Sequence, residues 1–442
     1  MVSEEQLQEI HQKLQTLKES GELNGKGADR SENLHRLFMY PAMMVPAAQH
    51  AVIKAIADCL PVGAWAMDPF MGSGTSLMSC MEFGFNVYGQ DINPFAVMLS
   101  KAKAEKYDIH QLKEVCKVVL DKISKDEETT VAVTFRNIDK WFNPDIQIGL
   151  SKIRRAIQTV DSQLIRYFLW VIMSEVIRTG SNDRTSTFKL HRRSEEDIQK
   201  RDVNVIKEFT ILVNRGIDDV ALYWDKLAKE SKLNEESRNV EADIHWGNTK
   251  KSIETETLFD LLVSSPPYGD NHTTVTYGQT SYLPLQWIDP DDLSCPYDYV
   301  KTTQEIDRHS LGGQTRKKEI MVAIAPVYAK TPSLKSFFES IPLEERDKYY
   351  KTLSFISDFD ESLDKIIASM EKDAFYIWTI GNRFVGNREV PNDQVLIELM
   401  ESRGIHLFER AERQILNKKQ PKKNNYSKTM EKEHILIFHR GV

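Results

Sequence analysis

The sequence predicts an α/β fold, and three observations support this. Four runs have the length and apolar character of strands: 64–67, 86–91, 240–245 and 258–264. The first leads into Asp68 and the second ends at Asp91, so both finish at an acid. A glycine-rich turn at 72–74 and a helical stretch at 77–83 lie between them, so strand, turn, helix and strand follow within about 30 residues. This succession predicts a Rossmann-like sheet.

The composition is that of a protein with a sizeable buried core. Its 442 residues are 41% hydrophobic and 28% charged, which excludes fibrous, disordered and disulfide-scaffold classes and favours two or three domains. No uninterrupted apolar run reaches about 18 residues. The start, Met1-Val2-Ser3-Glu4-Glu5, lacks the basic-then-apolar order of a signal peptide. We therefore expect a cytoplasmic protein that does not contact a membrane.

The cysteines and the net charge limit the possible metal sites and the possible modes of nucleic-acid binding. Cys59, Cys80, Cys116 and Cys295 are far apart and form no CxxC pair, so we expect reduced, mostly buried thiols and no metal site. The net charge of −7 argues against a protein that coats nucleic acid with its whole surface, but it leaves room for a local basic face.

Helical and irregular regions surround the sheet pattern. Ser3 to Gln6 has the spacing of a capping box, and the amphipathic helix that follows is predicted to end at Gly21. A helical period dominates from 107 to 234, too long for a simple crossover, and it predicts an inserted helical subdomain. The stretch 269–353 has no clear period and is interpreted as a long functional loop region. The remaining patterns predict a helix at 47–60 before the first strand and, in the closing part of the chain, a helix at 358–372, a strand at 375–380, a helix at 393–403, and strands near 406–408 and 434–438.

The glycine-rich turn and its acids indicate a nucleotide-type ligand. The lysine of a phosphate-cradling loop is missing, because Gly74 is followed by Thr75 and Ser76, and this disfavours ATP hydrolysis. Asp91 lies about 20 residues after the turn, where an acid binds a ribose diol. Taken alone, the turn is a weak signal, since it also serves to close a tight bend.

Ser265-Pro266-Pro267-Tyr268, directly after a predicted strand, resembles the catalytic tetrapeptide of the amino-methyltransferases, which act on an exocyclic amine of a nucleic-acid base. Such an amine is a poor nucleophile, since its lone pair is delocalised into the ring, and a site must accept hydrogen bonds from it. The Ser265 hydroxyl and the Pro266 carbonyl are acceptors, and consecutive prolines restrict the backbone. Tyr268 is expected to stack on a base flipped out of a duplex. No covalent nucleophile is needed. Cys295, in Ser-Cys-Pro-Tyr, is interpreted as structural, which disfavours methylation at carbon 5 of cytosine.

With these motifs the chain resembles the S-adenosylmethionine-dependent DNA amino-methyltransferases, which implies a class I methyltransferase sheet. Asp68-Pro69-Phe70-Met71-Gly72-Ser73-Gly74-Thr75 is similar to the family's cofactor loop, and Ser265 to Tyr268 to its catalytic tetrapeptide. The segment 35–42 and the strand ends at Asp91 and Asp243 are similar to further cofactor segments. The resemblance implies that S-adenosyl-L-methionine is held by Tyr40, Pro41, Asp68, Pro69, Phe70, Gly72, Gly74, Thr75, Asp91, Ile92, Asn93 and Asp243, and that Ser265, Pro266, Pro267 and Tyr268 are catalytic.

The resemblance, which covers about half the chain, also implies a domain organisation. We expect an N-terminal helix (1–34), the cofactor-binding half of the catalytic domain (35–106), a helical insertion (107–237), catalytic strands with the tetrapeptide (238–268), a loop-rich insertion (269–354) and the rest of the catalytic domain (355–442). Both insertions are candidates for target recognition.

Double-stranded DNA is the expected partner, gripped by basic residues in the insertions. Those expected to contact it are Arg184, Lys189, Arg192, Arg193, Tyr277, Arg316 and Lys317, and Lys418, Lys419, Lys422 and Lys423 form another basic run. Each run by itself is also compatible with a solvated face. In a restriction-modification system, a cognate restriction endonuclease would be a second partner.

The atom that is methylated stays open between two amines. Relatives with Ser before Pro-Pro-Tyr mostly act on cytosine N4, and those with Asp or Asn mostly on adenine N6, so we favour cytosine N4 and keep adenine N6 as the alternative. More distant alternatives are an RNA or protein amide as acceptor, and a non-catalytic DNA-binding module.

Overall fold

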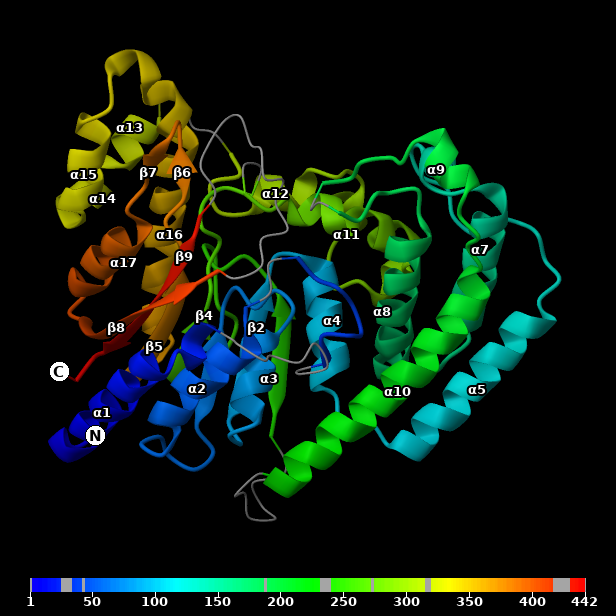
Figure 1. The fold of residues 1–442 in the computed structure, drawn as a ribbon, viewed down its shortest axis with the longest axis horizontal. Coiled ribbons are helices and arrows are strands. Elements are labelled where there is room, and N and C mark those ends of the chain that lie inside the picture. Colours follow the sequence, from blue (N-terminus) through cyan, green and yellow to red (C-terminus); the bar gives the residue numbers. More distant parts are fainter. Residues whose placement is uncertain are drawn as a thin grey trace.

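The centre of the protein is a seven-stranded sheet with the order β3-β2-β1-β4-β5-β9-β8, seen in a computed structural model (Figure 1). The structure describes residues 2–24, 34–41, 44–186, 189–230, 240–271, 274–314, 319–415 and 430–441. The strands are β1 (Trp65–Asp68), β2 (Asn86–Asp91), β3 (Ala242–Trp246), β4 (Phe259–Ser264), β5 (Met370–Ile380), β8 (His406–Gln414) and β9 (Lys432–His439). Neighbouring strands from β3 to β5 are parallel, and β9 is antiparallel to both β5 and β8. The predicted α/β fold is confirmed.

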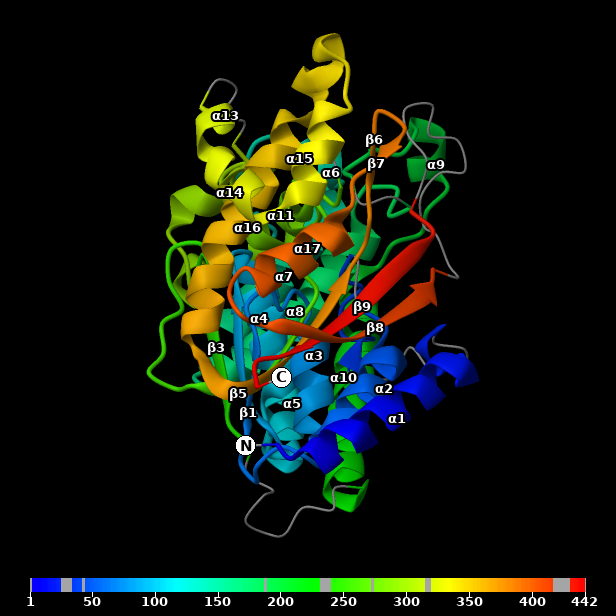
Figure 2. The same cartoon turned by 90° about the vertical axis from the view of Figure 1, so that its left-hand side faces the viewer.

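Alternate side chains along the strands belong to two buried hydrophobic clusters, one on each face of the sheet. Ala66 and Val87 enter one cluster, whereas their neighbours Met67 and Tyr88 enter the other. The first face packs against α1 (Glu4–Ser20), α2 (Pro46–Ala57), α3 (Thr75–Met81) and α4 (Pro94–Ala104), and the second against α16 (Tyr350–Ala368) and α17 (Asn392–Glu401). Figure 2 shows the sheet between α1 and α2 on one side and α16 on the other. Strands covered on both faces explain the nearly continuous apolar runs in the sequence.

Helix α1 begins and ends where the sequence predicts. The Ser3 hydroxyl accepts from the Gln6 backbone N–H, the Gln6 side chain accepts from the Ser3 N–H, and both bonds of the capping box are therefore present. Gly21 follows the helix with φ +74°, a conformation that favours glycine.

The stretch between β2 and β3 is mainly helical, as predicted. Its helices after α4 are α5 (Ile109–Lys125), α6 (Ile138–Trp141), α7 (Pro144–Gln158), α8 (Gln163–Gly180), α9 (Glu195–Gln199) and α10 (Val205–Glu230). The buried helix α8 packs against α4 and α10, which attaches this bundle to the first face of the sheet (Figure 1). Asp292, in the chain after β4, accepts hydrogen bonds from Arg166 and from the indole of Trp170, so the two insertions contact each other.

The region after β4 is more helical than the sequence suggested. It contains α11 (Tyr277–Trp287), α12 (Glu305–His309), α13 (Ile320–Ala323), α14 (Ala325–Lys330), α15 (Pro332–Glu339) and 3-10 turns at 290–292, 297–300 and 343–349. Most of these helices are short and several begin next to a proline, so none produces a long helical period.

Four boundaries near the end of the chain also differ. The helix expected at 358–372 is α16, which begins at Tyr350 and ends at Ala368, so that β5 already starts at Met370. Strand β8 continues to Gln414, beyond the expected 408, because its backbone pairs with β9 along that length. Pairing with a distant strand is not visible in a local pattern.

No helix within the described residues is long and apolar enough to cross a membrane. In the same part of the chain no cluster of three or more His, Cys, Asp or Glu side chains could hold a metal ion. Cys80 and Cys116 are buried and Cys59 and Cys295 partly buried, all as free thiols. Burial raises the pKa of Cys295 to about 12, which disfavours its thiolate.

Candidate active site

The glycine-rich loop joins β1 to α3 at the carboxyl end of the sheet. Gly72 and Gly74 have φ of +50° and +72°, and Gly74 is the residue that precedes the first turn of α3. The ammonium of the buried Lys103 donates to the carbonyl of Ser73 at 2.9 Å and so stabilises the loop. Burial lowers the pKa of Lys103 to about 7, because the ammonium has lost its water.

Asp68 lies beneath this loop and is fully buried. Its carboxylate accepts from the Phe70 N–H at 3.0 Å, from the Ser264 hydroxyl at 2.6 Å and from the Ser76 hydroxyl. Burial raises the pKa of Asp68 to about 6 despite these three donors. Through these hydrogen bonds Asp68 stabilises the conformation of the glycine-rich loop.

Asp91 is at the end of β2, next to the loop. It accepts from the Gly72 N–H at 2.9 Å and from the Asn93 N–H at 2.8 Å, and burial raises its pKa to about 6. Asn93 caps α4 and donates to the hydroxyls of Tyr40, at 3.0 Å, and Ser281, at 2.8 Å. Tyr40 in turn stacks on Tyr277 with ring centroids 5.8 Å apart.

One cleft brings the two motifs together. Among the residues expected to bind cofactor or base, it is lined by Tyr40, Pro69, Phe70, Gly72, Asp91, Ile92, Asn93, Ser265, Pro267 and Tyr277. The lining is completed by Asn248 and Thr249 after β3, and by Asn271, Ile306, Ser310 and Leu311 from the region after β4. Segments far apart in the sequence therefore meet at the carboxyl end of the parallel strands, where ligands of open α/β sheets bind.

Ser265 and Tyr268 are linked by a hydrogen-bond chain. The Ser265 and Tyr268 hydroxyl oxygens are 3.1 Å apart, and the Tyr268 hydroxyl donates to Glu433 at 3.0 Å. Ser265 lines the cleft, whereas Tyr268 packs against the second buried cluster and is not part of the lining. The Tyr268 hydroxyl is thus directed to β9. The sequence had predicted instead that the Tyr268 ring would stack on a base.

Other expected residues also lie outside the lining. They are Pro41, Asp68, Gly74, Thr75, Asp243 and Pro266. Thr75 contacts His35 at 3.1 Å, and burial, with a contribution from Lys103, lowers the pKa of that histidine to about 3. Asp243 is near the start of β3 and contacts His245 at 2.5 Å, so Asn248 and Thr249 occupy the place at the cleft that had been expected for it.

Some of the basic residues expected to bind DNA lie beside the cleft. Residues 182–186 and 189–193 run alongside each other, with Arg184 N donating to His191 O at 2.9 Å and Arg193 N to Asn182 O at 2.8 Å. The Leu190 N–H donates to the side chain of Gln279, which follows Tyr277 on α11. Arg192 pairs with Glu195 at 2.6 Å, while Arg184 and Lys189 are exposed. Arg316 and Lys317, and the run at 418–423, lie outside the described residues.

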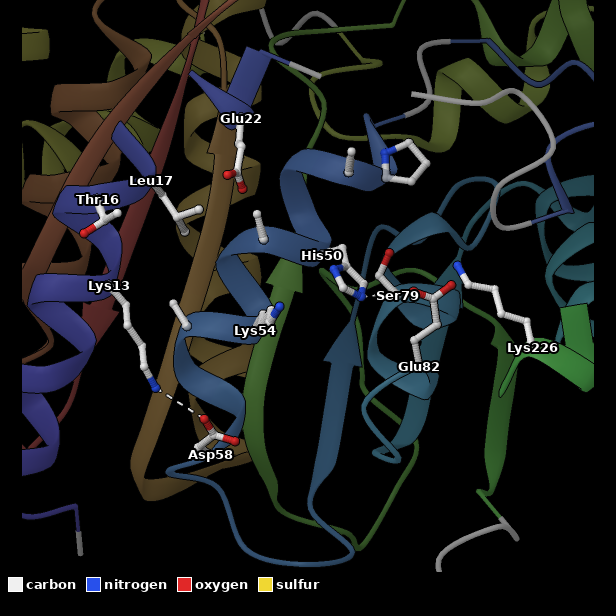
Figure 3. A pocket seen from close by; sticks show the side chains of 14 residues that line it. Lys13, Thr16, Leu17, Glu22, His50, Lys54, Asp58, Ser79, Glu82 and Lys226 are labelled. Atoms are coloured by element: carbon white, nitrogen blue, oxygen red, sulfur yellow. Dashed lines mark hydrogen bonds and ion pairs between the residues drawn. The ribbon is translucent and has the colours of Figure 1, made fainter. Parts of the chain in front are cut away.

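A larger hollow lies elsewhere, between α1, α2 and α3 (Figure 3). Its volume is about 580 Å³, against about 70 Å³ for the cleft by the same measure. Lys13 points to Asp58 at 3.2 Å across it and His50 to Glu82 at 3.4 Å, so its charges are of both signs. Neither the glycine-rich loop nor the tetrapeptide contributes to its lining, so the cleft is the candidate active site.

Sequence reasoning missed three polar residues near the cleft. The buried Asn271 donates its amide N–H to Asp307, and its Oδ1 has no hydrogen-bond partner among the described residues. Asp307 also accepts from the Gly278 N–H at 3.1 Å, and burial raises its pKa to about 6. Glu433 reaches the tetrapeptide from β9. The only local signal was the position of Asn271 just after Tyr268, because the partners come from distant segments.

Comparison with known proteins places the chain in a family. No family model matches it. It is 31% identical over 426 residues to the Type II methyltransferase M.MvaI of Kocuria varians, which covers 92% of this chain and 91% of that relative. A stretch of 100 residues is 38% identical to the Type II methyltransferase M.MjaII of Methanocaldococcus jannaschii, covering 23% and 18% of the two chains. Among solved structures, the rRNA methyltransferase aviRa of Streptomyces viridochromogenes aligns over 90% of this chain and 86% of that one, with a TM-score of 0.27 and 9% identity, values too low to support an argument. The near full-length match at 31% identity, together with the loop and tetrapeptide that share one cleft, shows that the chain belongs to the Type II methyltransferase family.

Proposed function

We propose that the protein transfers a methyl group from S-adenosyl-L-methionine to the N4 amine of cytosine in double-stranded DNA, within a restriction-modification system. The observation that carries the proposal is that Ser265 and Pro267 line the same cleft as Gly72 and Asp91. A residue suited to accept from an amine thus adjoins residues suited to a nucleoside.

The polar groups of the cleft fit the proposed cofactor. Asp91 is a ribose-binding acid by position, and Ile92 and Phe70 offer apolar surface for a base. The unpartnered, buried Oδ1 of Asn271 accepts an N–H, of which the cofactor has several.

In this mechanism the protein binds and orients the cofactor and the target base, and it accepts hydrogen bonds from the target amine. The cofactor, when bound, supplies an electrophilic methyl group on its sulfonium. Ser265 Oγ accepts an N–H of the target amine, and the Pro266 carbonyl accepts the second, which localises the nitrogen lone pair for in-line attack. Positioning of the two reactants supplies most of the rate. Tyr277, which stacks on Tyr40 in the lining of the cleft, is assigned the role of covering the flipped base.

The helical bundle and the region after β4 are the proposed DNA-binding parts, since Leu190, between the basic residues Lys189 and Arg192, hydrogen-bonds to Gln279 of α11. Phosphate contacts are assigned to Arg184, Lys189, Arg192 and Arg193. A cognate restriction endonuclease is the proposed functional partner.

Mass spectrometry of nucleosides tests the proposal directly. Unmethylated plasmid DNA is incubated with the protein and S-adenosyl-L-methionine, then digested to nucleosides. N4-methylcytosine is expected, as serine precedes Pro-Pro-Tyr. N6-methyladenine would overturn the base assignment and keep the mechanism. Absence of any methylated nucleoside on varied DNA would overturn the DNA substrate.

A further inference from the structure

We propose that Glu433 is a positioning residue that sets the direction of the hydrogen bond between Ser265 and Tyr268, so that Ser265 presents only lone pairs to the target amine. This inference rests on the proposed function, in which Ser265 accepts from the amine. Glu433 belongs to β9, and 165 residues separate it from Tyr268 along the chain.

The direction follows from counting hydrogens along the chain of contacts. Arg413 Nε donates to Glu433 Oε2 at 2.6 Å, so the acid is paired with a cation and is an acceptor only. The single hydrogen of the Tyr268 hydroxyl then goes to Glu433 Oε1 at 3.0 Å. The Tyr268 oxygen has only lone pairs left for Ser265 Oγ, 3.1 Å away. Ser265 must therefore be the donor in that contact, and its one hydrogen is used.

The arrangement is suited to an amine substrate. A freely rotating serine hydroxyl would also donate its hydrogen to the amine nitrogen, in competition for the lone pair that attacks the methyl group. With the hydrogen held by Tyr268, Ser265 Oγ faces the cleft as an acceptor. The side chains of Arg413 and Glu433 are only 10% and 12% exposed, so little water reaches them to replace a partner. Their burial therefore preserves the direction of these hydrogen bonds.

Glu433→Gln gives a sharp test because it reverses the direction of the hydrogen bonds from residue 433 through Tyr268 to Ser265. Arg413 has only donors, so the glutamine turns its oxygen to Arg413 and its NH₂ to Tyr268. The Tyr268 oxygen then accepts from the glutamine and donates to Ser265, which leaves the Ser265 hydrogen free to point into the cleft. The volume of the side chain is nearly unchanged.

The experiment measures single-turnover transfer of a labelled methyl group from S-adenosyl-L-methionine to unmethylated plasmid DNA. Glu433→Gln is expected to slow the rate at least about tenfold with cofactor affinity by calorimetry nearly unchanged, while the lost ion pair with Arg413 lowers the melting temperature. Glu412→Gln is the matched control, since Glu412 is on the adjacent strand and pairs with Lys432 at 2.9 Å. It should transfer at the wild-type rate.

A double-mutant cycle separates positioning from a structural role. Tyr268→Phe removes the oxygen through which Glu433 acts, so adding Glu433→Gln to it should change the rate by less than about twofold. Equal slowing by Glu433→Gln in both backgrounds would overturn the proposal, and so would a wild-type rate in the single variant. Ser265→Ala distinguishes the two levels: a wild-type rate in that variant would overturn the proposed role of Ser265 itself, whereas a slow Ser265→Ala beside a fast Glu433→Gln would overturn only the positioning role.

Discussion

The hydroxyl of Ser264 donates a hydrogen bond of 2.6 Å to the buried carboxylate of Asp68, and this contact joins the two motifs of the chain. Asp68 opens the glycine-rich loop, and Ser264 is the residue just before the tetrapeptide. Because β1 and β4 are adjacent and parallel, their ends come together at the cleft. The positions of loop and tetrapeptide are therefore coupled through one buried acid.

Ser264→Ala is expected to destabilise the fold by about 1–3 kcal/mol, because it leaves a buried carboxylate with one donor fewer. The loss should be larger at pH 8 than at pH 5. Burial holds the pKa of Asp68 at about 6 against an ordinary value of 3.8, so its contribution to stability is present at low pH and is lost as the pH rises towards 6. Removing a donor raises that pKa further. Urea unfolding at both pH values measures this, with the exposed Ser124→Ala as control. Equal losses in the two variants would contradict the prediction.

Affinity for S-adenosyl-L-methionine should fall below about pH 6. Burial raises the pKa of Asp91 to about 6, and a protonated acid is a poorer acceptor for a ribose hydroxyl. We expect constant affinity from pH 7 to 8 and a loss approaching tenfold per pH unit below 6, measured by calorimetry. Asp307 titrates in the same range, so Asp91→Asn and Asp307→Asn are compared. A wild-type pH slope in Asp91→Asn would assign the effect to another group.

Gly74→Ala should impair both folding and cofactor binding. A Cβ at this position would lie 2.8 Å from Ser100 Oγ, and φ is +72°. Gly63→Ala is a close control, since Gly63 has φ +77° and open space around it. Both variants pay the cost of positive φ, about 1–2 kcal/mol. Only Gly74→Ala should also weaken cofactor binding, by roughly tenfold, since Ser100 and the loop must move apart. Similar cofactor affinities in the two variants would contradict this.

Arg184→Gln should weaken DNA binding equally for all sequences. Arg184 is exposed in the segment that contacts α11, and it has no ion pair among the described residues. Loss of one phosphate contact lowers the slope of log affinity against log salt by about 1. Arg192→Gln should have a smaller effect, because Arg192 already pairs with Glu195. Lys229→Gln, in the last turn of α10, is the control. An unchanged salt slope in Arg184→Gln would exclude a phosphate contact there.

Much of the fold could be predicted because its signals are local. The apolar runs became β1 to β4 within one or two residues, and the Ser3 capping box and Gly21 bound α1. The region after β4 was predicted less well, since helices of four to eleven residues such as α13 and α11 carry too few turns for a periodic pattern. The extent of β8 depended on its pairing with β9.

By itself the sequence determined the sheet, the loop beside its acids and the position of the Ser-Pro-Pro-Tyr tetrapeptide after a strand, because strand alternation and glycine conformation depend on neighbours along the chain. Only the tertiary structure decided which polar atoms face the cleft. Asp68 turned inward to Ser264, the Tyr268 hydroxyl to Glu433, and the Asn271 amide to Asp307, which leaves Asn271 Oδ1 without a partner among the described residues. A buried polar group takes whichever partner the packing of distant segments brings within about 3 Å, and that choice has no signature in the local order of residues.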